Sequence, residues 1–376
     1  MVQFSINSTV LSNALTTAGR VIASRSVAML GNFYFQLYPD HLSITASDLE
    51  IFIRTSLPLE FEQGRYYIFM LYSNTLLTAL KEIPDCMVRF ELDDKTCTVR
   101  YNNGSFTLPL LNSDDDYPRP VEFREDDSCI EMDFTMLNDV CSTLPDFVSD
   151  DTLRPIMSTL HFNIMKEKID FVATNGSSLA LLRTVDKQKG PFTGTFNLSL
   201  KTASILSSIM KRKDQSQEEV ITIRCNGTNA EFTIGSYIVT SRLIEGKFPN
   251  YNAVWPKDNV NFLQTDCESL IAAIRRCRVF SDINSKIILE FRKGSITVKA
   301  QNMDSLQSSE ENIHASYQDA DVTVAFNGEM LSSILKNLDK GTVILEFKGA
   351  TTPFIIHSDC QEKCCTHEFL LMPMVV

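Results

Sequence analysis

The chain lacks any apolar run long enough to cross a bilayer, which takes about 20 residues. Its opening residues, MVQFSINSTV, also lack the basic segment and the apolar segment that together make a secretory signal peptide. We therefore expect an intracellular, cytoplasmic protein.

The cysteines lack the spacing of a disulfide framework or a metal site. None of the ten forms a CxxC pair, and Cys364 and Cys365 are adjacent, which suits neither a normal disulfide nor a tetrahedral zinc site. We expect reduced thiols, as is usual in the cytosol. Those expected to lie among core residues are Cys86, Cys97, Cys129, Cys141, Cys225, Cys267 and Cys277.

Catalytic motifs are lacking as well. The five histidines show no HxxxH or HExxH spacing, and no nucleophile motif or P-loop is present. The run Asp114, Asp115 and Asp116 is a candidate for metal or acid–base chemistry, but no histidine or glutamate lies at ligand spacing, which favours a solvated turn. The stretch ATNGS (173–177) could cradle a phosphate, although the turn at the end of a strand explains it equally. We expect no enzyme, no cofactor and no metal.

Positive charge is in deficit, with a formal net charge of −12, which argues against indiscriminate nucleic-acid binding by the whole surface. The cations nevertheless gather on the predicted helices. For each of them alone, complementing a helix dipole is a sufficient explanation. The bias of all six helices favours a shared cationic surface that contacts DNA phosphates without reading bases. The DNA-facing candidates are Arg20, Arg25, Lys81, Lys201, Lys211, Arg212, Lys213, Arg275, Arg276 and Lys336.

A repeated unit organises the chain. Stretches starting at Val2, Cys129 and Asn259 each begin with alternating apolar residues, as in a strand, and continue with apolar residues at helical spacing, such as Val10, Leu11 and Leu15. Polar residues at each junction are candidate helix caps. These candidates are Ser8 in the first stretch, Asp133 or Thr135 in the second, and Thr265 or Asp266 in the third.

Two further blocks recur in the same order, one reading strand, helix, loop, strand and one ending a strand in a polar turn. The repetition predicts three similar α+β domains, at residues 1–120, 128–253 and 259–376, each with two helices on one face of antiparallel sheets and about eight strands. The intervening segments 112–127 and 247–259, rich in Pro, Asp and Asn, are interpreted as turns and connectors.

The apolar C-terminus FLLMPMVV is interpreted in two parts. Phe369 to Leu371 are predicted to form a last strand. Pro373 cannot donate to a ladder, so the strand should end before Met372, and Met372, Pro373 and Met374 should then line a binding surface.

The order and spacing of several segments resemble the bacterial β sliding clamp family, the processivity subunit of DNA polymerase III. The resemblance runs along essentially the whole chain, and no single motif carries it. Its segments are MLGNFYFQL and LSITASDLEI (29–51), FVATNGSSLALL (171–182), GKFPNYNAVWP (246–256), VAFNGEMLSSIL (324–335) and FLLMPMVV.

The resemblance implies half of a closed ring, completed around duplex DNA by a head-to-tail homodimer. It places Phe106 and Leu108 against Val279 and Phe280 of the second copy. It also implies a pocket for short peptides of polymerases, the clamp loader and repair proteins. The pocket residues would be Met157, Thr174, Gly176, Ser177, Ser178, Leu179, Pro249, Val254, Met330, Pro353, Met372, Pro373 and Met374.

The chain departs from the family pattern at two places in that pocket. The usual DGHRL is Asn175 to Leu179 here, which removes two bulky side chains, and Ala253 stands where the family often has arginine. Two other functions remain open: a protein-interaction scaffold built from repeats that never encircles DNA, and a hydrolase using the Asp114 run.

Overall fold

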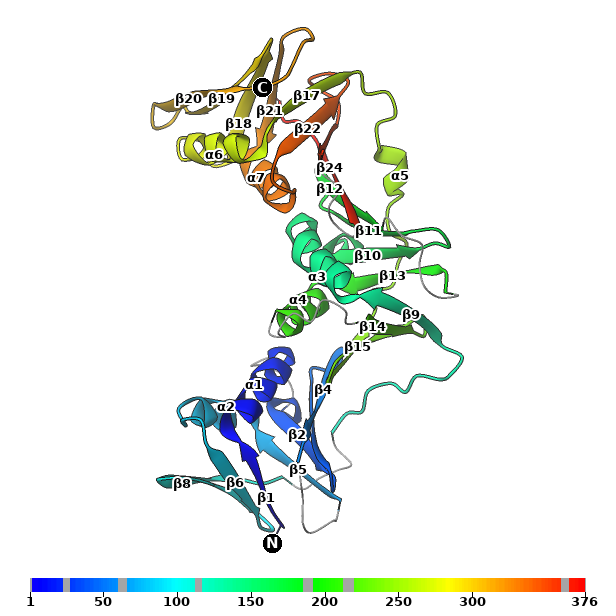
Figure 1. The fold of residues 1–376 in the computed structure, drawn as a ribbon, viewed down its shortest axis with the longest axis vertical. Helices are drawn as coiled ribbons and strands as arrows, with labels where there is room; N and C mark the ends of the chain where they lie inside the picture. Colours follow the sequence, from blue (N-terminus) through cyan, green and yellow to red (C-terminus); the bar gives the residue numbers. More distant parts are fainter. Residues whose placement is uncertain are drawn as a thin grey trace. The chain divides into compact units, whose positions relative to one another are not determined.

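We analysed a computed structural model of the chain (Figure 1). The residues that it describes are 2–22, 28–59, 66–111, 117–184, 192–211, 220–359 and 365–375. Arg25, Arg212, Lys213 and the run Asp114 to Asp116 lie outside these ranges.

One order of elements occurs three times: strand, helix, four strands, helix, three strands. This confirms the predicted α+β class, and all the strand pairings are antiparallel. The first copy contains β1 (Val2–Asn7), α1 (Ser8–Ala18), η1 (Gly19–Val21), η2 (Ala28–Gly31), β2 (Asn32–Leu37), β3 (His41–Ser47), β4 (Ile51–Pro58), β5 (Tyr67–Tyr72), α2 (Ser73–Lys81), β6 (Met87–Leu92), β7 (Thr96–Tyr101) and β8 (Gly104–Pro109).

The second and third copies are separated by a connector that carries a short helix, α5 (Tyr251–Val254). The second copy contains β9 (Ser128–Asp133), α3 (Phe134–Thr143), η3 (Leu144–Phe147), η4 (Pro155–Ser158), β10 (Thr159–Ile164), β11 (Ile169–Thr174), β12 (Ser178–Thr184), β13 (Gly194–Ser199), α4 (Leu200–Met210), β14 (Val220–Cys225), β15 (Asn229–Ile234) and β16 (Tyr237–Arg242). The third contains β17 (Asn261–Asp266), α6 (Cys267–Arg278), β18 (Lys286–Arg292), β19 (Ser295–Asn302), β20 (Gln307–His314), β21 (Val322–Asn327), α7 (Gly328–Asn337), β22 (Thr342–Phe347), β23 (Phe354–Ser358) and β24 (Cys365–Leu371).

Helices α1, α6 and α7 begin where a side chain satisfies a free backbone amide. Asn7 caps α1 by accepting a hydrogen bond from the amide of Val10 at 3.0 Å, so the prediction of Ser8 as the cap was wrong by one residue. Asp266, one of two candidates, caps α6 through the amide of Ser269 at 2.8 Å. Leu11 and Leu15 are buried as expected, whereas Val10 is exposed.

The strands form four sheets. Two have eight strands, in the orders β5-β2-β3-β4-β16-β15-β14-β9 and β13-β10-β11-β12-β24-β23-β22-β17. Each is made of two four-stranded halves that join edge to edge, one through β4 and β16 and the other through β12 and β24. The two remaining sheets, β1-β6-β7-β8 and β20-β19-β18-β21, stay four-stranded.

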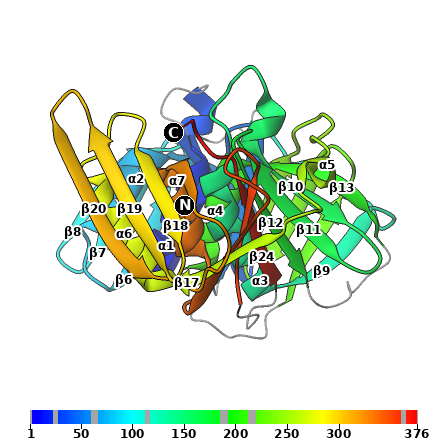
Figure 2. The ribbon, with the colours of Figure 1, turned by 90° about the horizontal axis from the view of Figure 1, so that it is seen from above.

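The chain packs as two units, each containing one eight-stranded and one four-stranded sheet. Unit 1 comprises residues 2–138 and 201–243, and unit 2 comprises 139–200 and 244–375, within the described ranges. In unit 2, α6 packs against α7 and lies across β18, β19 and β20 (Figure 2). In unit 1, α1 packs against α2 and on β3 and β4.

Most of the cysteines in the described residues lie in the core. Eight cysteines fall in these residues, all as free thiols, and six are buried. Cys129 contradicts the prediction of a core position, because Ile130 and Met132 are the residues of β9 that face the core, which leaves Cys129 exposed. Cys86 is only half-buried.

The C-terminal strand ends where the sequence predicts. β24 runs to Leu371 between β12 and β23. Met372 and Pro373 lie beyond it, and Met374 forms an isolated bridge with Ala325 of β21. No helix among the described residues has the length and apolar character needed to cross a membrane.

Candidate functional site: the connector and the C-terminal tail of unit 2

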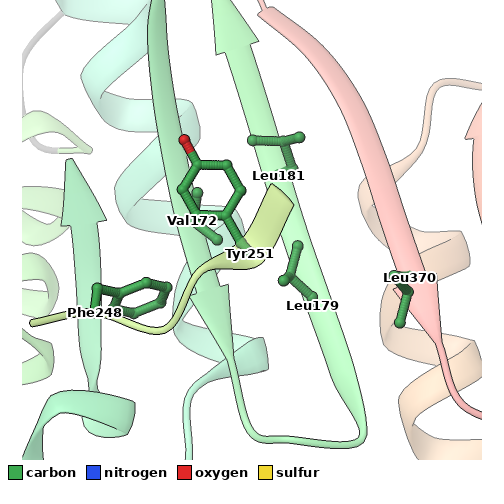
Figure 3. Close-up of a cluster of buried hydrophobic side chains, with 6 residues drawn as sticks. All are labelled: Val172, Leu179, Leu181, Phe248, Tyr251 and Leu370. Carbon is green, nitrogen blue, oxygen red and sulfur yellow. The ribbon is translucent and has the colours of Figure 1, made fainter. Parts of the chain in front are cut away.

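A cluster of buried side chains fastens the connector to the eight-stranded sheet of unit 2. Phe248 and Tyr251 come from the connector, and strands β11, β12 and β24 supply the remaining members (Figure 3). We call this cluster, together with the turn 174–178 and the tail 372–374, the connector site. Its buried members are Val172, Leu179, Leu181, Phe248, Tyr251 and Leu370, with Ile156 and Trp255 packed at its margin.

Polar contacts hold the two aromatic residues of the connector in place. The Tyr251 hydroxyl donates to the Asp170 carboxylate at 2.9 Å and accepts from the Asn163 amide at 2.8 Å. Asp170 is itself buried and is held by two hydrogen bonds from Arg183, at 2.7 and 3.1 Å. Burial of the Tyr251 ring raises the pKa of its hydroxyl, so the group stays neutral.

Phe248 stacks on the imidazole of His161, with ring centroids 4.4 Å apart. Nδ1 of that imidazole lies 2.7 Å from Oδ1 of Asn197, whose amide group donates to the carbonyls of Ile244 and Gly246. Burial lowers the pKa of His161. The neutral ring is therefore the form that packs against the connector.

The polar groups of the turn 174–178 satisfy one another. Oδ1 of Asn175 accepts from the amides of Ser177 and Ser178, at 3.0 and 2.8 Å. Gly176 has φ = +92°, a conformation that favours glycine. This network supports a turn that ends a strand, the simpler of the two explanations for ATNGS.

The tail joins this turn to the third copy of the repeat. The amide of Met372 donates to the carbonyl of Ser177 at 2.9 Å, and the amide of Met374 donates to Ala325 at 2.7 Å. The Ser178 hydroxyl lies 3.2 Å from the sulfur of Met330, at the start of α7. The turn, α7 and the tail therefore meet. They carry Ser177, Ser178, Met330, Met372 and Met374, which the resemblance assigns to one pocket.

The other predicted pocket residues lie in the turn 174–178, on β12, in η4, in the connector, directly before β23 and in the tail. Leu179 is inside the cluster, and Thr174 is buried in the turn below it. Pro353 precedes Phe354, which pairs with Leu371 beside the tail. Met157 is buried in η4, next to Ile156 of the margin. The exposed ones include Gly176, Pro249, Val254 (53% exposed) and Met372 (39% exposed), with Pro373 half-buried.

Sequence reasoning missed much of what holds the connector site together. Local propensity predicted only turns and connectors for the segment 247–259, and the resemblance assigned Pro249 and Val254 to the pocket. Neither identified Phe248 and Tyr251 as members of the cluster or Trp255 at its margin. The aromatic spacing F-x-x-Y-x-x-x-W was the available signal, because large aromatic side chains are unusual in a solvated loop.

The predicted cations differ in how free they are. Lys201 is bound to the Asp48 carboxylate and to the carbonyl of Val21, and Arg276 makes a two-point ion pair with Glu311, at 2.9 and 2.5 Å. That pair lowers the pKa of the Glu311 carboxyl. Exposed cations on or next to the helices are Arg20, Lys81, Lys211, Arg275 and Lys336.

The predicted dimer residues fall on one edge strand, β8, and at the end of one helix, α6. Phe106 is half-buried on β8, and Leu108 of the same strand is already buried within the chain. Val279 (76% exposed) and Phe280 follow α6. Glu310 and Glu311 lie on β20, the strand on which α6 packs, and have partners within the chain in Lys299 and Arg276.

No group of three or more His, Cys, Asp or Glu side chains suited to a metal ion is present in the described ranges.

Comparisons with known proteins match the whole chain. Three family models follow one another along it: the N-terminal domain of the DNA polymerase III beta subunit at residues 2–120, the central domain at 137–250 and the C-terminal domain at 252–375. The beta sliding clamp homolog GriR of Streptomyces muensis is 23% identical over 376 residues, which are 99% of each chain. The beta sliding clamp of Haemophilus influenzae is 23% identical over 380 residues, again 99% of each.

Solved structures match over the same length. A sliding clamp of Pseudomonas aeruginosa bound to griselimycin superimposes with a TM-score of 0.92 at 20% identity, covering 100% of both chains. The Bacillus subtilis sliding clamp gives 0.89 at 21% identity, covering 100% of this chain and 99% of that one.

Proposed function

The chain belongs to the bacterial β sliding clamp family, the beta subunits of DNA polymerase III, and we infer that it encircles duplex DNA and tethers the replicative polymerase to it. It is a non-catalytic processivity subunit that works as a head-to-tail homodimer in the cytoplasm. We assign its three clamp domains to residues 1–120, 128–253 and 259–376. Processivity follows from linkage, because a tethered polymerase rebinds at a high effective concentration.

The observation that carries this proposal is the way in which the sheets join. Each copy of the repeat has eight strands. At both joints within the chain, the fourth strand of one copy pairs with the eighth strand of the next copy: β4 with β16, and β12 with β24. The remaining fourth and last strands are β20 and β8, and each ends a four-stranded sheet. Pairing β20 of one protomer with β8 of a second protomer repeats the joint at both ends and closes a ring instead of building a filament.

The two existing joints also fix the register of the third. Ile53 pairs with Val239 at one joint, and Ala180 pairs with Phe369 at the other. Ser309 of β20 is equivalent to Ile53 of β4 and Ala180 of β12. Each of the three pairs with a buried alanine of the preceding strand, which is Ala300, Ala46 and Ala173 respectively.

Phe106 likewise holds the place of Val239 and Phe369 on the last strand, each of them lying opposite a buried residue of the neighbouring strand. We therefore place Phe106 of one protomer opposite Ser309 of the other protomer, with both side chains on the inner face of the joined sheet. Val279 and Phe280 would then cover this joint from the end of α6.

The connector site is the proposed docking site for short peptides of the polymerase, the clamp loader and repair proteins. Its floor is buried, while Val254 and Met372 leave apolar surface exposed. Methionine suits a surface that accepts several partners, because its side chain is flexible and polarisable. The small Ser177 and Ala253 leave this surface more open than in the usual family pattern.

The decisive experiment measures retention on DNA. The dimer is loaded onto a nicked circular plasmid by its clamp loader and is then separated from free protein by gel filtration. We expect it to stay on the circle and to be lost after one restriction cut, because a ring slides off a free end. Equal retention on circular and linear DNA would mean ordinary surface binding and would overturn the proposal.

A further inference from the structure

Unit 1 carries a cleft of about 470 Å³ that the proposed function leaves unused. Strands β2, β3, β4, β14 and β15 form its floor, and the segment 117–123 forms one wall. We call it the arginine cleft, after Arg54, Arg119 and Arg224, which line it. Its volume falls within the range typical of ligand sites, roughly 300–1,000 Å³.

The wall of the arginine cleft is anchored by aromatic packing. Tyr117 is buried and stacks on Tyr34 of β2, with ring centroids 4.9 Å apart and an interplanar angle of 17°. Met70, Met29 and Ile68 pack around the same pair. The segment that follows Tyr117 is therefore held at a fixed place along the sheet.

The arginine cleft occupies the same place on its sheet as the connector site does in unit 2. The joints align Phe52 with Leu179, since these residues pair with Thr240 and Leu370 respectively. Counting along the paired strands from this point places Tyr34 at the position of His161. The stack of Tyr117 on Tyr34 thus repeats the stack of Phe248 on His161.

The chemistry of the two sites differs. Arg54 stands where Leu181 stands in the connector site, and Thr45 where Val172 stands. The apolar floor of unit 2 is thereby replaced by a polar one. Three arginines line the cleft together with two glutamates, Glu122 and Glu231, of which Glu231 lies directly opposite Arg224 in the sheet.

We propose that the arginine cleft binds a short, extended peptide segment of a partner protein through aspartate or glutamate side chains. A guanidinium presents a planar pair of donors that matches a carboxylate. Tyr66, Pro118 and Val121 supply apolar walls for the neighbouring side chains of such a peptide. The net charge of −12 repels acidic segments from most of the surface and so favours this cleft.

The mixed charge of the cleft favours a peptide over nucleic acid. Glu122 and Glu231 would lie against a phosphate backbone, which carries negative charge at every unit and has no donor to offer them. A peptide alternates carboxylates with backbone amides, and those amides can donate to the two glutamates. The occupant is therefore a protein segment, and its site is separate from the connector site.

The test uses the full-length protein and a fluorescein-labelled hexapeptide, Asp-Glu-Pro-Phe-Asp-Glu, in an anisotropy titration at low salt. The same peptide with Asn and Gln in place of the acids is the matched probe, and an oligothymidylate is the competitor. We expect the acidic peptide to bind at least about tenfold more tightly than its amide counterpart, as for hydrogen bonds to charged groups.

Arg54→Glu should weaken binding of the acidic peptide by about tenfold or more. Arg89→Glu, an equal charge change at another exposed strand residue of unit 1, should leave it within about twofold. If the charge reversal Arg54→Glu lowers the melting temperature of the protein, the neutral variant Arg54→Gln replaces it in the test. The chain has a single tryptophan, Trp255 at the connector site, so its emission should not change when the peptide enters the arginine cleft.

Three results would overturn the proposal: equal affinity for the acidic and amide peptides, equal losses from Arg54→Glu and Arg89→Glu, or displacement of the peptide by the oligothymidylate. A change in Trp255 emission would place the peptide in the connector site and would also overturn it. None of these outcomes affects retention on circular DNA, so failure here is distinguishable from failure of the proposed function.

Discussion

His161 shows how one residue links packing to pH. Its ring is buried between Phe248 and the sheet, and burial lowers its pKa, so the folded protein keeps it neutral while the unfolded chain protonates it near pH 6.5. A depressed pKa means that the stability contributed by the neutral ring is complete above about pH 6.5 and is lost as the pH falls below it.

We therefore predict that His161→Phe changes how stability depends on pH. At pH 8 the variant should be less stable by about 1–3 kcal/mol, because Oδ1 of the buried Asn197 loses its partner. The difference from the wild type should shrink as the pH falls toward about 5, since the variant has no ring to protonate. Denaturant unfolding across the pH range measures this difference.

The control for this prediction is His314→Phe at an exposed position of β20. This imidazole lies outside the buried cluster, so replacing it should leave the acid sensitivity of the connector in place. A constant difference between His161→Phe and the wild type would show that the buried ring does not set this acid sensitivity.

Single residues were the level at which sequence reasoning was least accurate. The alternation in β9 was recognised, yet Cys129 was assigned to the core although it lies on the opposite face from Ile130 and Met132. The cap of α1 was placed at Ser8, because serine and asparagine are both good caps and stand next to each other there. Neither error changed the predicted element.

At the scale of elements, the C-terminal tail is attached by two backbone hydrogen bonds, from Met372 to Ser177 and from Met374 to Ala325. The strand before it, β24, is held on both sides by β12 and β23. Leu371 is therefore the last residue of the sheet, while the proposed docking surface includes the tail that follows it.

Deleting 372–376 should consequently leave the fold and the dimer intact but abolish polymerase tethering. Primer extension with the clamp loader measures the loss as product length. The matched control deletes only 375–376, where Val375 is 90% exposed, and keeps the bonds of Met372 and Met374. Normal product lengths with the longer deletion would remove the tail from the docking site.

Helix α6 carries the second prediction at this scale. Arg275 is exposed, whereas the charge of Arg276 is partly neutralised by its ion pair with Glu311. Arg275→Glu together with Arg276→Glu should shorten the residence time of loaded clamps on circular DNA, with the largest effect at low salt, where counterion release is strongest. Most of this effect should come from Arg275.

The control is Arg292→Glu with Lys293→Glu, an adjacent exposed pair at the β18–β19 turn of the same unit, with the same charge change. Residence times that fall equally in the two double variants would indicate a general charge effect rather than contact by the helix. Unchanged residence at low salt in the α6 variant would argue against a DNA-facing α6.

For the whole molecule, the proposed joint between β20 and β8 makes a prediction about register. If Phe106 lies opposite Ser309, then Thr107 lies opposite Ser308, with both side chains on the outer face. A chain carrying Thr107→Cys and Ser308→Cys should form a disulfide-linked dimer under mild oxidation, visible as twice the mass of 42.4 kDa.

The off-register control pairs Thr107→Cys with Asn312→Cys, on the same exposed face of β20 but about 13 Å further along the strand. It should form little linked dimer. Equal linkage in both variants, or a monomer by light scattering at working concentrations, would contradict the proposed joint.

The sequence by itself determined the α+β class, the threefold order of elements, the cationic bias of the helices and the place where the last strand ends. These follow from local periodicity and from Pro373, which act over a few residues. Tertiary structure alone decided which edge strands meet, that Phe248 and Tyr251 bury their rings against the sheet, and that Tyr34 and Tyr117 form the wall of a second cleft. The physical reason is that these contacts join residues far apart in the chain, where pairing and burial depend on the whole sheet rather than on the local pattern.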